Sequence, residues 1–178
     1  LLSPYLNNGL LMPAEVVAAA EAAFRESRVP IASVEGFIRQ IIGWREYVWG
    51  LYWMWMPEYK VENALDAHLD LPPVLEGRST NMRCVAHVME TIDSYSWAHH
   101  IQRLMILGNL ALTAGINPRQ FTNWMSRVFI DAAEWVMVPN VVGMALHADG
   151  GRMATKPYAS GGAYICLLYT SPSPRDAT

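Results

Sequence analysis

The sequence predicts an all-α fold. Apolar residues recur at spacings of three and four over most of the chain, and no stretch shows the sustained apolar–polar alternation of a strand. Prolines and helix-capping residues divide this pattern into segments of ordinary helical length. The 178 residues are enough for one domain with a core of its own.

The first two helices are expected over residues 14–28 and 34–55. Pro13 suits the first turn of the earlier helix, and Pro30 follows its end. Ser33 is a candidate cap for the second helix, which ends before another proline. This second helix is apolar nearly all round, which predicts burial on several of its faces.

A looser connection is expected over residues 58–79, with a short helix at 61–67. Thr80 can cap a long helical region over residues 81–114. A single helix of that length is unusual, so we expect an interruption near residues 94–96.

Gly115 closes this long region, and Asn117 caps the next helix. We expect that helix over residues 118–138, with a proline in its first turn and Pro139 at its end. Glycine-rich loops follow around a short helical piece at residues 141–146.

The last thirteen residues, 166–178, differ in character from the rest. They show no periodicity and resemble the translation of a sequencing adapter in a broken reading frame. We therefore expect a partial helical domain over residues 1–165 and a non-native tail that includes Cys166.

Composition narrows the class of protein. The chain is 52% hydrophobic, and its net charge of −3 gives no global case for binding nucleic acid. Seven tryptophans and eight tyrosines suit a core built around a flat aromatic cofactor, although large residues that simply fill a helical core would look the same. Two cysteines do not make a disulfide framework.

The expected setting is a cytoplasmic, monomeric protein that does not enter a membrane. The chain opens without the basic start and the cleavage site of a signal peptide. The apolar run at residues 104–116 is shorter than the ~20 residues that a membrane helix needs.

Residues 94–113 carry the polar cluster that points to chemistry. Helical spacing places His99 beside Gln102 and Arg103, and His100 beside Arg103. An arginine in such apolar surroundings needs an anionic partner, because an unpaired buried charge is very costly.

Eight segments of the chain together resemble one protein family. They are LSPYLNNGLL (2–11), GFIRQIIGWREYV (36–48), NMRC (81–84), AHHIQRLM (98–105), DAAEWV (131–136), PNVVGM (139–144), ADGG (148–151) and TKPYASGGAYI (155–165). In this order they resemble the photolyase and cryptochrome superfamily, in particular the prokaryotic photolyase-related branch with the iron–sulfur (6-4) photolyases. The resemblance identifies a family rather than an activity.

The resemblance implies the helical FAD-binding domain of such a protein, cut at both ends. The preceding domain, which binds an antenna pigment in the family, is then expected to be missing from this chain. By the resemblance, six residues are expected to bind FAD: Ser3 at the phosphates, Gln40, Trp44 and Arg45 along the flavin cavity, and Arg103 paired with Asp131 beside the flavin.

The implied reaction is light-driven repair of UV-damaged DNA by electron transfer from reduced FAD, most closely of the (6-4) type. His100, with its neighbour His99, matches the position of the proton donor beside the flipped lesion. The alternative for these residues is a histidine pair satisfied by hydrogen bonds in a core.

Two more roles follow from the resemblance. Cys84 matches the first of four cysteines that hold a [4Fe–4S] cluster, whose other ligands are expected beyond residue 165; without the resemblance it would be an ordinary buried thiol. Trp124 matches a tryptophan of the electron-transfer route. Because other positions of that route are substituted, Trp135 or Trp97 are further candidates, with core packing as the alternative for both.

The expected DNA contacts are Arg39, Arg152 and Lys156, which would bind phosphates around the cavity mouth; solvated surface charges would look the same. Two other functions stay open. One is a cryptochrome-like flavin photoreceptor, and the other is an inactive fragment without FAD.

Overall fold

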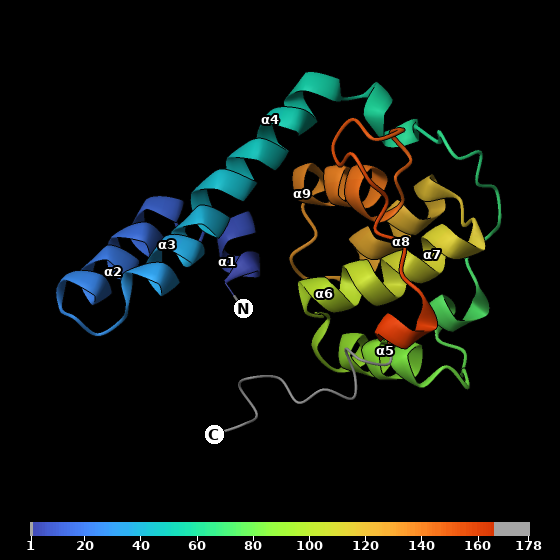
Figure 1. Cartoon of the computed structure of the whole chain (residues 1–178). Helices are drawn as coiled ribbons and strands as arrows, with labels where there is room; N and C mark the ends of the chain where they lie inside the picture. The colour runs from blue at the N-terminus through green and yellow to red at the C-terminus, as the bar shows by residue number, and fades with distance from the viewer. Residues whose placement is uncertain (1, 166–178) are drawn as a thin grey trace.

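The computed structural model describes residues 2–165, and within them the protein is helical, with no β-sheet (Figure 1). The only extended pairing there is an isolated bridge between Leu69 and Ile116. The predicted all-α class is therefore confirmed. The expected non-native tail, residues 166–178 with Cys166, lies outside the described residues.

Nine α-helices and several tighter or wider turns make up the described chain. The α-helices are α1 (Ser3–Asn7), α2 (Pro13–Arg25), α3 (Ile31–Arg39), α4 (Arg45–Trp55), α5 (Arg83–Tyr95), α6 (His100–Gln102), α7 (Asn109–Ala114), α8 (Pro118–Val128) and α9 (Glu134–Val138). Three π-helical segments, Gln40–Trp44, Arg103–Gly108 and Pro139–Ala145, continue α3, α6 and α9. Short 3₁₀ turns lie at Glu58–Val61 and Pro73–Glu76.

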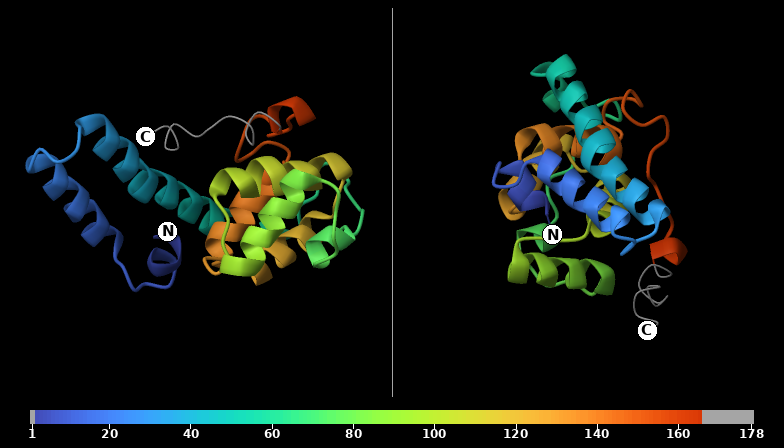
Figure 2. Two further views of the ribbon diagram at one scale, coloured as in Figure 1. Left: turned by 90° about the horizontal axis from the view of Figure 1, so that it is seen from below. Right: turned by 90° about the vertical axis from the view of Figure 1, so that its left-hand side faces the viewer.

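An N-terminal arm projects from a helical body. The arm consists of residues 2–44, and the body packs α5 to α9 around the end of α4 (Figures 1 and 2). Helix α3, its π segment and α4 form one continuous rod that joins the two parts, and α1 lies between the rod and the body. The arm has only a small buried cluster of its own, formed by Leu6, Val16 and Ile41.

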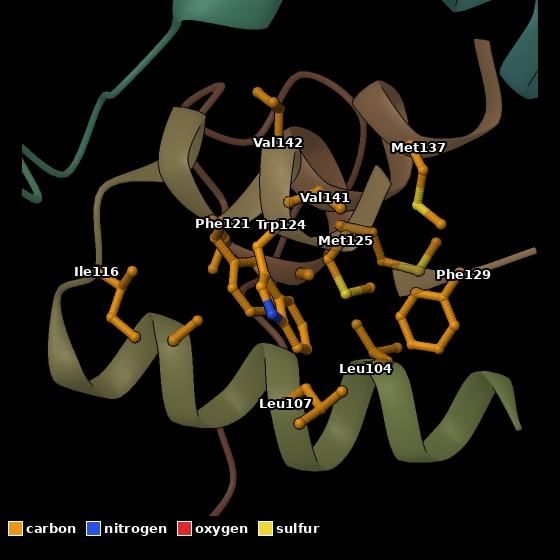
Figure 3. Close-up of a cluster of buried hydrophobic side chains, with 14 of the residues drawn as sticks. Leu104, Leu107, Ile116, Phe121, Trp124, Met125, Phe129, Met137, Val141 and Val142 are labelled. Atoms are coloured by element: carbon orange, nitrogen blue, oxygen red, sulfur yellow. The ribbon is translucent and has the colours of Figure 1, made fainter. Parts of the chain in front are cut away.

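The core of the body lies between α8 and the helix that runs from α6 to α7 (Figure 3). Trp124 is 2% exposed there, stacks on Phe121 with ring centroids 5.6 Å apart, and donates its indole N–H to the Leu75 carbonyl at 2.6 Å. This bond satisfies the one polar atom of a fully buried indole. Trp124 therefore packs as a core residue in this fold.

Several helix boundaries confirm the local signals. Helix α5 ends at Tyr95, and Ser96 adopts a left-handed conformation at φ 49°, where an interruption was predicted. Gly115 closes α7 at φ 70°. The Asn117 side chain caps α8 by accepting hydrogen bonds from the backbone N–H groups of Arg119 and Gln120.

Several boundary predictions were wrong. Helix α2 ends at Arg25, and the next helix begins at Ile31 after Pro30, so Ser33 is not its cap. Arg83 begins α5, although the Thr80 hydroxyl does accept a bond from the Met82 N–H. The expected helix at 61–67 does not form; the helical structure nearest to it is the 3₁₀ turn Glu58–Val61.

The helix after Asn117 is shorter than predicted. Helix α8 ends at Val128, because the backbone of Phe129 is extended. The Phe129 side chain is buried in the core. Pro139, predicted to end a helix, instead begins the last π segment. In that irregular turn the Asn140 side chain donates to the Val136 carbonyl at 2.8 Å.

The predicted all-round burial of residues 34–55 was also wrong. Val48 and Leu51 face the core, but Trp53 is 64% and Met54 71% exposed. Composition cannot distinguish these faces, because the partner of each face is set by the rest of the fold. Within the described part of the chain, no helix has both the length and the apolarity to cross a bilayer.

Candidate functional site

A buried ion pair between Arg103 and Asp131 forms the centre of the candidate site. The Arg103 Nη1 and Nη2 atoms donate to Asp131 Oδ1 and Oδ2 at 2.8 and 3.0 Å, and the side chains are only 13% and 7% exposed. Arg103 Nε also donates to the Ala98 carbonyl at 2.8 Å, and the guanidinium lies 3.9 Å from the Phe129 ring centroid. Asp131 is thus the anion that Arg103 required, in the bidentate geometry that makes such pairs strong.

Helix α1 brings two further donors to Asp131. The Ser3 hydroxyl donates to Oδ2 at 2.6 Å, and the Asn7 side-chain amide donates to the Asp131 carbonyl at 2.7 Å. Arg45 Nη1 in turn donates to Asn7 Oδ1 at 2.8 Å. These contacts join α1, the start of α4 and the body into one polar network.

Arg45 sits in this network against an aromatic ring. Its guanidinium carbon lies 4.9 Å from the ring centroid of Trp135, and Trp44 precedes it at the end of the π segment. Burial lowers the pKa of Arg45, and the nearby Glu46 carboxylate opposes this shift. The site therefore combines two guanidinium groups with aromatic faces.

Two of the three π segments carry predicted site residues. Gln40 and Trp44 begin and end the first, and Arg103 begins the second. A π-helical turn is rare and is found frequently at functional sites, because its extra residue redirects side chains that a regular helix would place elsewhere. Sequence periodicity did not reveal these turns.

His99 and His100 have different local environments. His99 caps α6: its Nδ1 accepts from the Ile101 N–H at 3.1 Å, and its own N–H donates to Gln102 at 3.0 Å. His100 is the first residue of α6 and precedes Arg103 by three residues. Burial by surrounding protein atoms lowers the pKa of His100, and the charges of Arg103 and His99 lower it further.

The predicted DNA-binding cations do not form one patch. Arg39 pairs with Glu35 on the same helix, whereas Arg152 pairs with Glu62 and lies over the Trp55 ring. Arg39 and Trp55 belong to the same rod and are roughly 24 Å apart along it at 1.5 Å per residue. Lys156 is exposed in the loop that follows.

Cys84 and Trp124 lie away from the ion pair. Cys84 is half-buried at the start of α5 and packs against the main core. Within residues 2–165 no three histidine, cysteine, aspartate or glutamate side chains gather as a metal site. The Phe129 ring lies between Trp124 and Arg103, with its centroid 6.4 Å from that of Trp124 and 3.9 Å from the Arg103 guanidinium carbon.

Sequence reasoning missed Asn7 and Phe129, which complete the network around Asp131. Asn7 belongs to an Asn-Asn-Gly stretch that indicates a turn, and its long-range bonds have no local signal. Phe129 is distant from Arg103 in the sequence, and the fold alone brings its ring against the guanidinium. A charged residue surrounded by apolar sequence was the one available indication that such partners exist.

The chain is thus helical and contains a buried pair of Arg103 and Asp131, with aromatic rings against the Arg103 guanidinium. A (6-4) photolyase from Agrobacterium fabrum (strain C58 / ATCC 33970) is 52% identical to it over 166 residues, which cover 93% of this chain and 32% of the relative. An uncharacterized protein, R855 of Acanthamoeba polyphaga mimivirus, is 38% identical over 64 residues, or 36% of this chain and 52% of that protein. No protein-family model matches the chain. The chain belongs to the photolyase family, and it spans about a third of the length of the photolyase that it resembles.

Proposed function

We propose that this chain is the FAD-binding part of a light-driven enzyme that repairs UV-damaged DNA, with (6-4) photoproducts as its substrates. The observation that carries the proposal is the buried, bidentate Arg103–Asp131 pair in a chain that is 52% identical to a (6-4) photolyase. Bound FAD would supply the photo-excited electron for repair. The chain's own residues would hold the cofactor, position the lesion and move a proton.

The residues present fit a flavin cofactor. Arg103, Arg45 and Gln40 carry hydrogen-bond donors suited to phosphate and to an anionic ring, and Trp44 adds an aromatic face. Ser3 would donate to a phosphate by exchanging its present bond to Asp131. Asn140, in the last π segment, keeps its buried Oδ1 without a partner among the described residues. An acceptor of this kind suits a ligand N–H group.

The ion pair has a defined task in this proposal. Asp131 holds the Arg103 fork in one orientation, and Ser3 and Asn7 hold Asp131. The positive guanidinium then stabilises negative charge that develops beside it. Because Asp131 already holds the Arg103 guanidinium in place, the guanidinium does not have to move during the reaction to stabilise this negative charge.

His100, assisted by its neighbour His99, is the proposed proton donor to the lesion. A donor must be protonated, and the lowered pKa of His100 means that its protonated fraction falls as pH rises through a value below the usual 6.5. The proton-dependent step should therefore be favoured toward lower pH. A DNA phosphate near the ring would raise this pKa and widen the working range.

The remaining assignments belong to the whole protein. Arg39, Arg152 and Lys156 would contact DNA phosphates, with the first two exchanging their carboxylate partners for DNA. Cys84 would be one ligand of a [4Fe–4S] cluster, and Trp124 would take part in electron transfer. An antenna pigment would bind elsewhere in the protein.

A cryptochrome-like photoreceptor is the second candidate. Met137 is 3% exposed, at a position where the resemblance implies a carboxylate. A thioether cannot exchange a proton with a cofactor, so this substitution keeps the photoreceptor as an alternative to repair.

The test begins with the purified chain incubated with FAD and passed through gel filtration. We expect flavin absorption bands to stay with the wild-type protein and to be lost with Asp131→Asn, while Glu35→Gln, which breaks an exposed pair, retains them. Repair of a (6-4) oligonucleotide should then disappear in His100→Ala. FAD binding without any repair would favour the photoreceptor, and a colourless wild-type protein would contradict FAD binding by this chain.

A further inference from the structure

Residues 149–160 cross the body as an irregular strap. This strap contains no helix or strand, and it runs from the end of α4 across α7 (Figure 1). Its backbone groups therefore lack the regular hydrogen-bond ladder that holds a helix or a sheet together. The strap is held instead by a few side chains at its two ends.

The first end of the strap is anchored by the buried carboxylate of Asp149. This residue is 6% exposed, and its two oxygens accept from the N–H groups of Gly151 and Met153, both at 2.9 Å. The Tyr59 hydroxyl donates to the same carboxylate, and the Tyr47 hydroxyl donates to the Met153 carbonyl at 3.1 Å. Hydrogen bonds to a charged acceptor are strong, so the strap is fixed up to Met153.

The second end of the strap is anchored by one side chain, Asn109. Its Nδ2 donates to the Ser160 carbonyl at 3.1 Å, and its Oδ1 accepts from the Ser160 N–H at 2.9 Å. A carboxamide has the donor and acceptor geometry of a peptide group, so this pair reproduces the reciprocal bonds of two paired strand residues. Because Asn109 is only 5% exposed, little water competes for these bonds.

The span between the two anchors has no attachment of its own. Within the described chain, no hydrogen bond joins residues 154–159 to the rest of the protein, and residues 155–159 are exposed. Lys156 lies in this span and forms no ion pair with a described residue. The position of its ammonium group is therefore set by the two anchors.

A buried asparagine is otherwise an unfavourable choice at this position. Asn109 begins α7 directly after the π segment Arg103–Gly108, and asparagine is less favourable in a helix than alanine or leucine. An apolar side chain would pack there without losing hydrogen bonds to water. What asparagine adds is a reciprocal bond to a backbone segment 51 residues away. The strap and the Arg103 guanidinium are thus attached to one continuous helix.

We propose that Asn109 is a positioning residue, which anchors the strap and so holds Lys156 where it can contact a phosphodiester group of DNA. An ammonium group on a long stem gains most from a phosphate when its backbone is already fixed, because less freedom is then lost on binding. The contact between Lys156 and DNA belongs to the proposed function, so that part of the inference rests on it. The anchoring by Asn109 does not, because it is made within the chain.

The first test measures the anchor without DNA, by hydrogen exchange of single amides in NMR spectra of the full chain. In Asn109→Ala we expect the Ser160 amide to exchange about tenfold faster, because its acceptor is lost. The Met153 amide, held by Asp149, should keep its protection. Ser160→Ala is the matched control: its hydroxyl has no partner among the described residues, and its backbone groups remain available to Asn109. The amide at position 160 should stay protected in that variant.

The second test uses Asn109→Asp, which keeps the shape of the side chain. The ionised carboxylate can still accept from the Ser160 N–H, but it faces the Ser160 carbonyl with a second acceptor, so the anchor should open at neutral pH. Burial raises the pKa of a carboxyl group, and the protonated form donates where the amide did. Protection relative to the wild-type protein should therefore return as pH falls through that raised value. A loss of protection that is the same at every pH would overturn the hydrogen-bonded anchor.

The third test connects the anchor to DNA. The affinity of the chain for a duplex with one (6-4) photoproduct is measured over a range of salt concentrations. Lys156→Ala should reduce the slope of log K against log salt by about 0.9, the value for one phosphate contact. Asn109→Ala should reduce the slope by a similar amount, although Asn109 carries no charge, and the double variant should bind like Lys156→Ala alone. Ser160→Ala should bind like the wild-type chain.

The outcomes separate this inference from the proposed function. If Lys156→Ala reduces the slope and Asn109→Ala does not, or if the two effects add, the positioning role is overturned and the proposed DNA contact stands. If Lys156→Ala leaves the slope unchanged, or the wild-type chain binds no duplex, the DNA contact fails, and the exchange measurements still decide the anchor. Unchanged protection of the Ser160 amide in Asn109→Ala would overturn the inference in either case.

Discussion

Asp131 owes its position to residues that are distant in the sequence. Its carboxylate accepts from Arg103 and Ser3, and its carbonyl accepts from Asn7. Taking both charges out of water costs several kcal/mol per ion, and the bidentate geometry and the added hydrogen bonds offset that cost. The pair is therefore better evidence for a site that needs a fixed positive group than for a gain in stability.

Removing one charge of this pair should be strongly destabilising. Asp131→Asn leaves the buried Arg103 without a counter-charge, and we expect the free energy of unfolding to fall by about 3–5 kcal/mol. Urea denaturation followed by circular dichroism measures this change. The matched control is Glu35→Gln, whose exposed pair with Arg39 should contribute no more than about 1 kcal/mol. Equal effects of the two variants would show that Arg103 does not need Asp131.

At the scale of elements, the π segments decide where the site residues point. The segment Pro139–Ala145 also lets the chain pass close to Tyr59, which is fully buried. The Tyr59 hydroxyl donates to Asp149 Oδ2 at 2.8 Å, and burial together with this bond raises the pKa of Tyr59. Gly143 leaves the space in which this hydroxyl lies.

A methyl group at Gly143 should disrupt this contact. In Gly143→Ala the new Cβ would collide with the Tyr59 hydroxyl and lie 2.7 Å from Met153 Cβ, so we expect a loss of about 1–3 kcal/mol in unfolding free energy. Gly50→Ala is the control in α4, where no atom lies within 4 Å of the new Cβ. That variant should gain about 0.5–1 kcal/mol from helix propensity. Thermal unfolding of both variants tests the opposite signs, and a stabilised Gly143→Ala would contradict the packing described for Tyr59.

Across the whole molecule, buried apolar side chains are distributed unevenly. The arm has the small cluster of Leu6, Val16 and Ile41, whereas the body contains the main core around Trp124. Local stability follows buried contacts, because each region can open separately when little apolar surface holds it closed. The hydrogen bonds of Ser3 and Asn7 to Asp131 hold α1 on the body, and Arg45 joins the same network from α4.

Hydrogen exchange should reveal this difference. We expect the amides of α2 to exchange by local opening, at a lower free energy than those of α8, which should exchange only on global unfolding. Native-state exchange with mass spectrometry at increasing urea measures both helices in one sample, so α8 is an internal control. Equal protection of α2 and α8 would show that the arm and the body unfold as one unit.

Signals within a few residues of each other determined much of the fold. The helical periodicity, the break before Ser96, the turn at Gly115 and the cap at Asn117 all follow from local backbone chemistry, and the structure confirms them. The resemblance to a family added the pairing of Arg103 with Asp131, which the structure contains. Their role beside a flavin stays a prediction.

Tertiary structure alone decided which faces are buried and which partners complete the site. The exposed side of α4, the early end of α8 at Val128 and the helical path through Pro139 depend on neighbours that no local pattern specifies. The same is true of Asn7 and of the aromatic contacts of Trp49. Backbone conformation is set mainly by adjacent residues, whereas burial and charge pairing are set by whatever the folded chain brings into contact, and for that reason the sequence determined the helices while the structure determined the site.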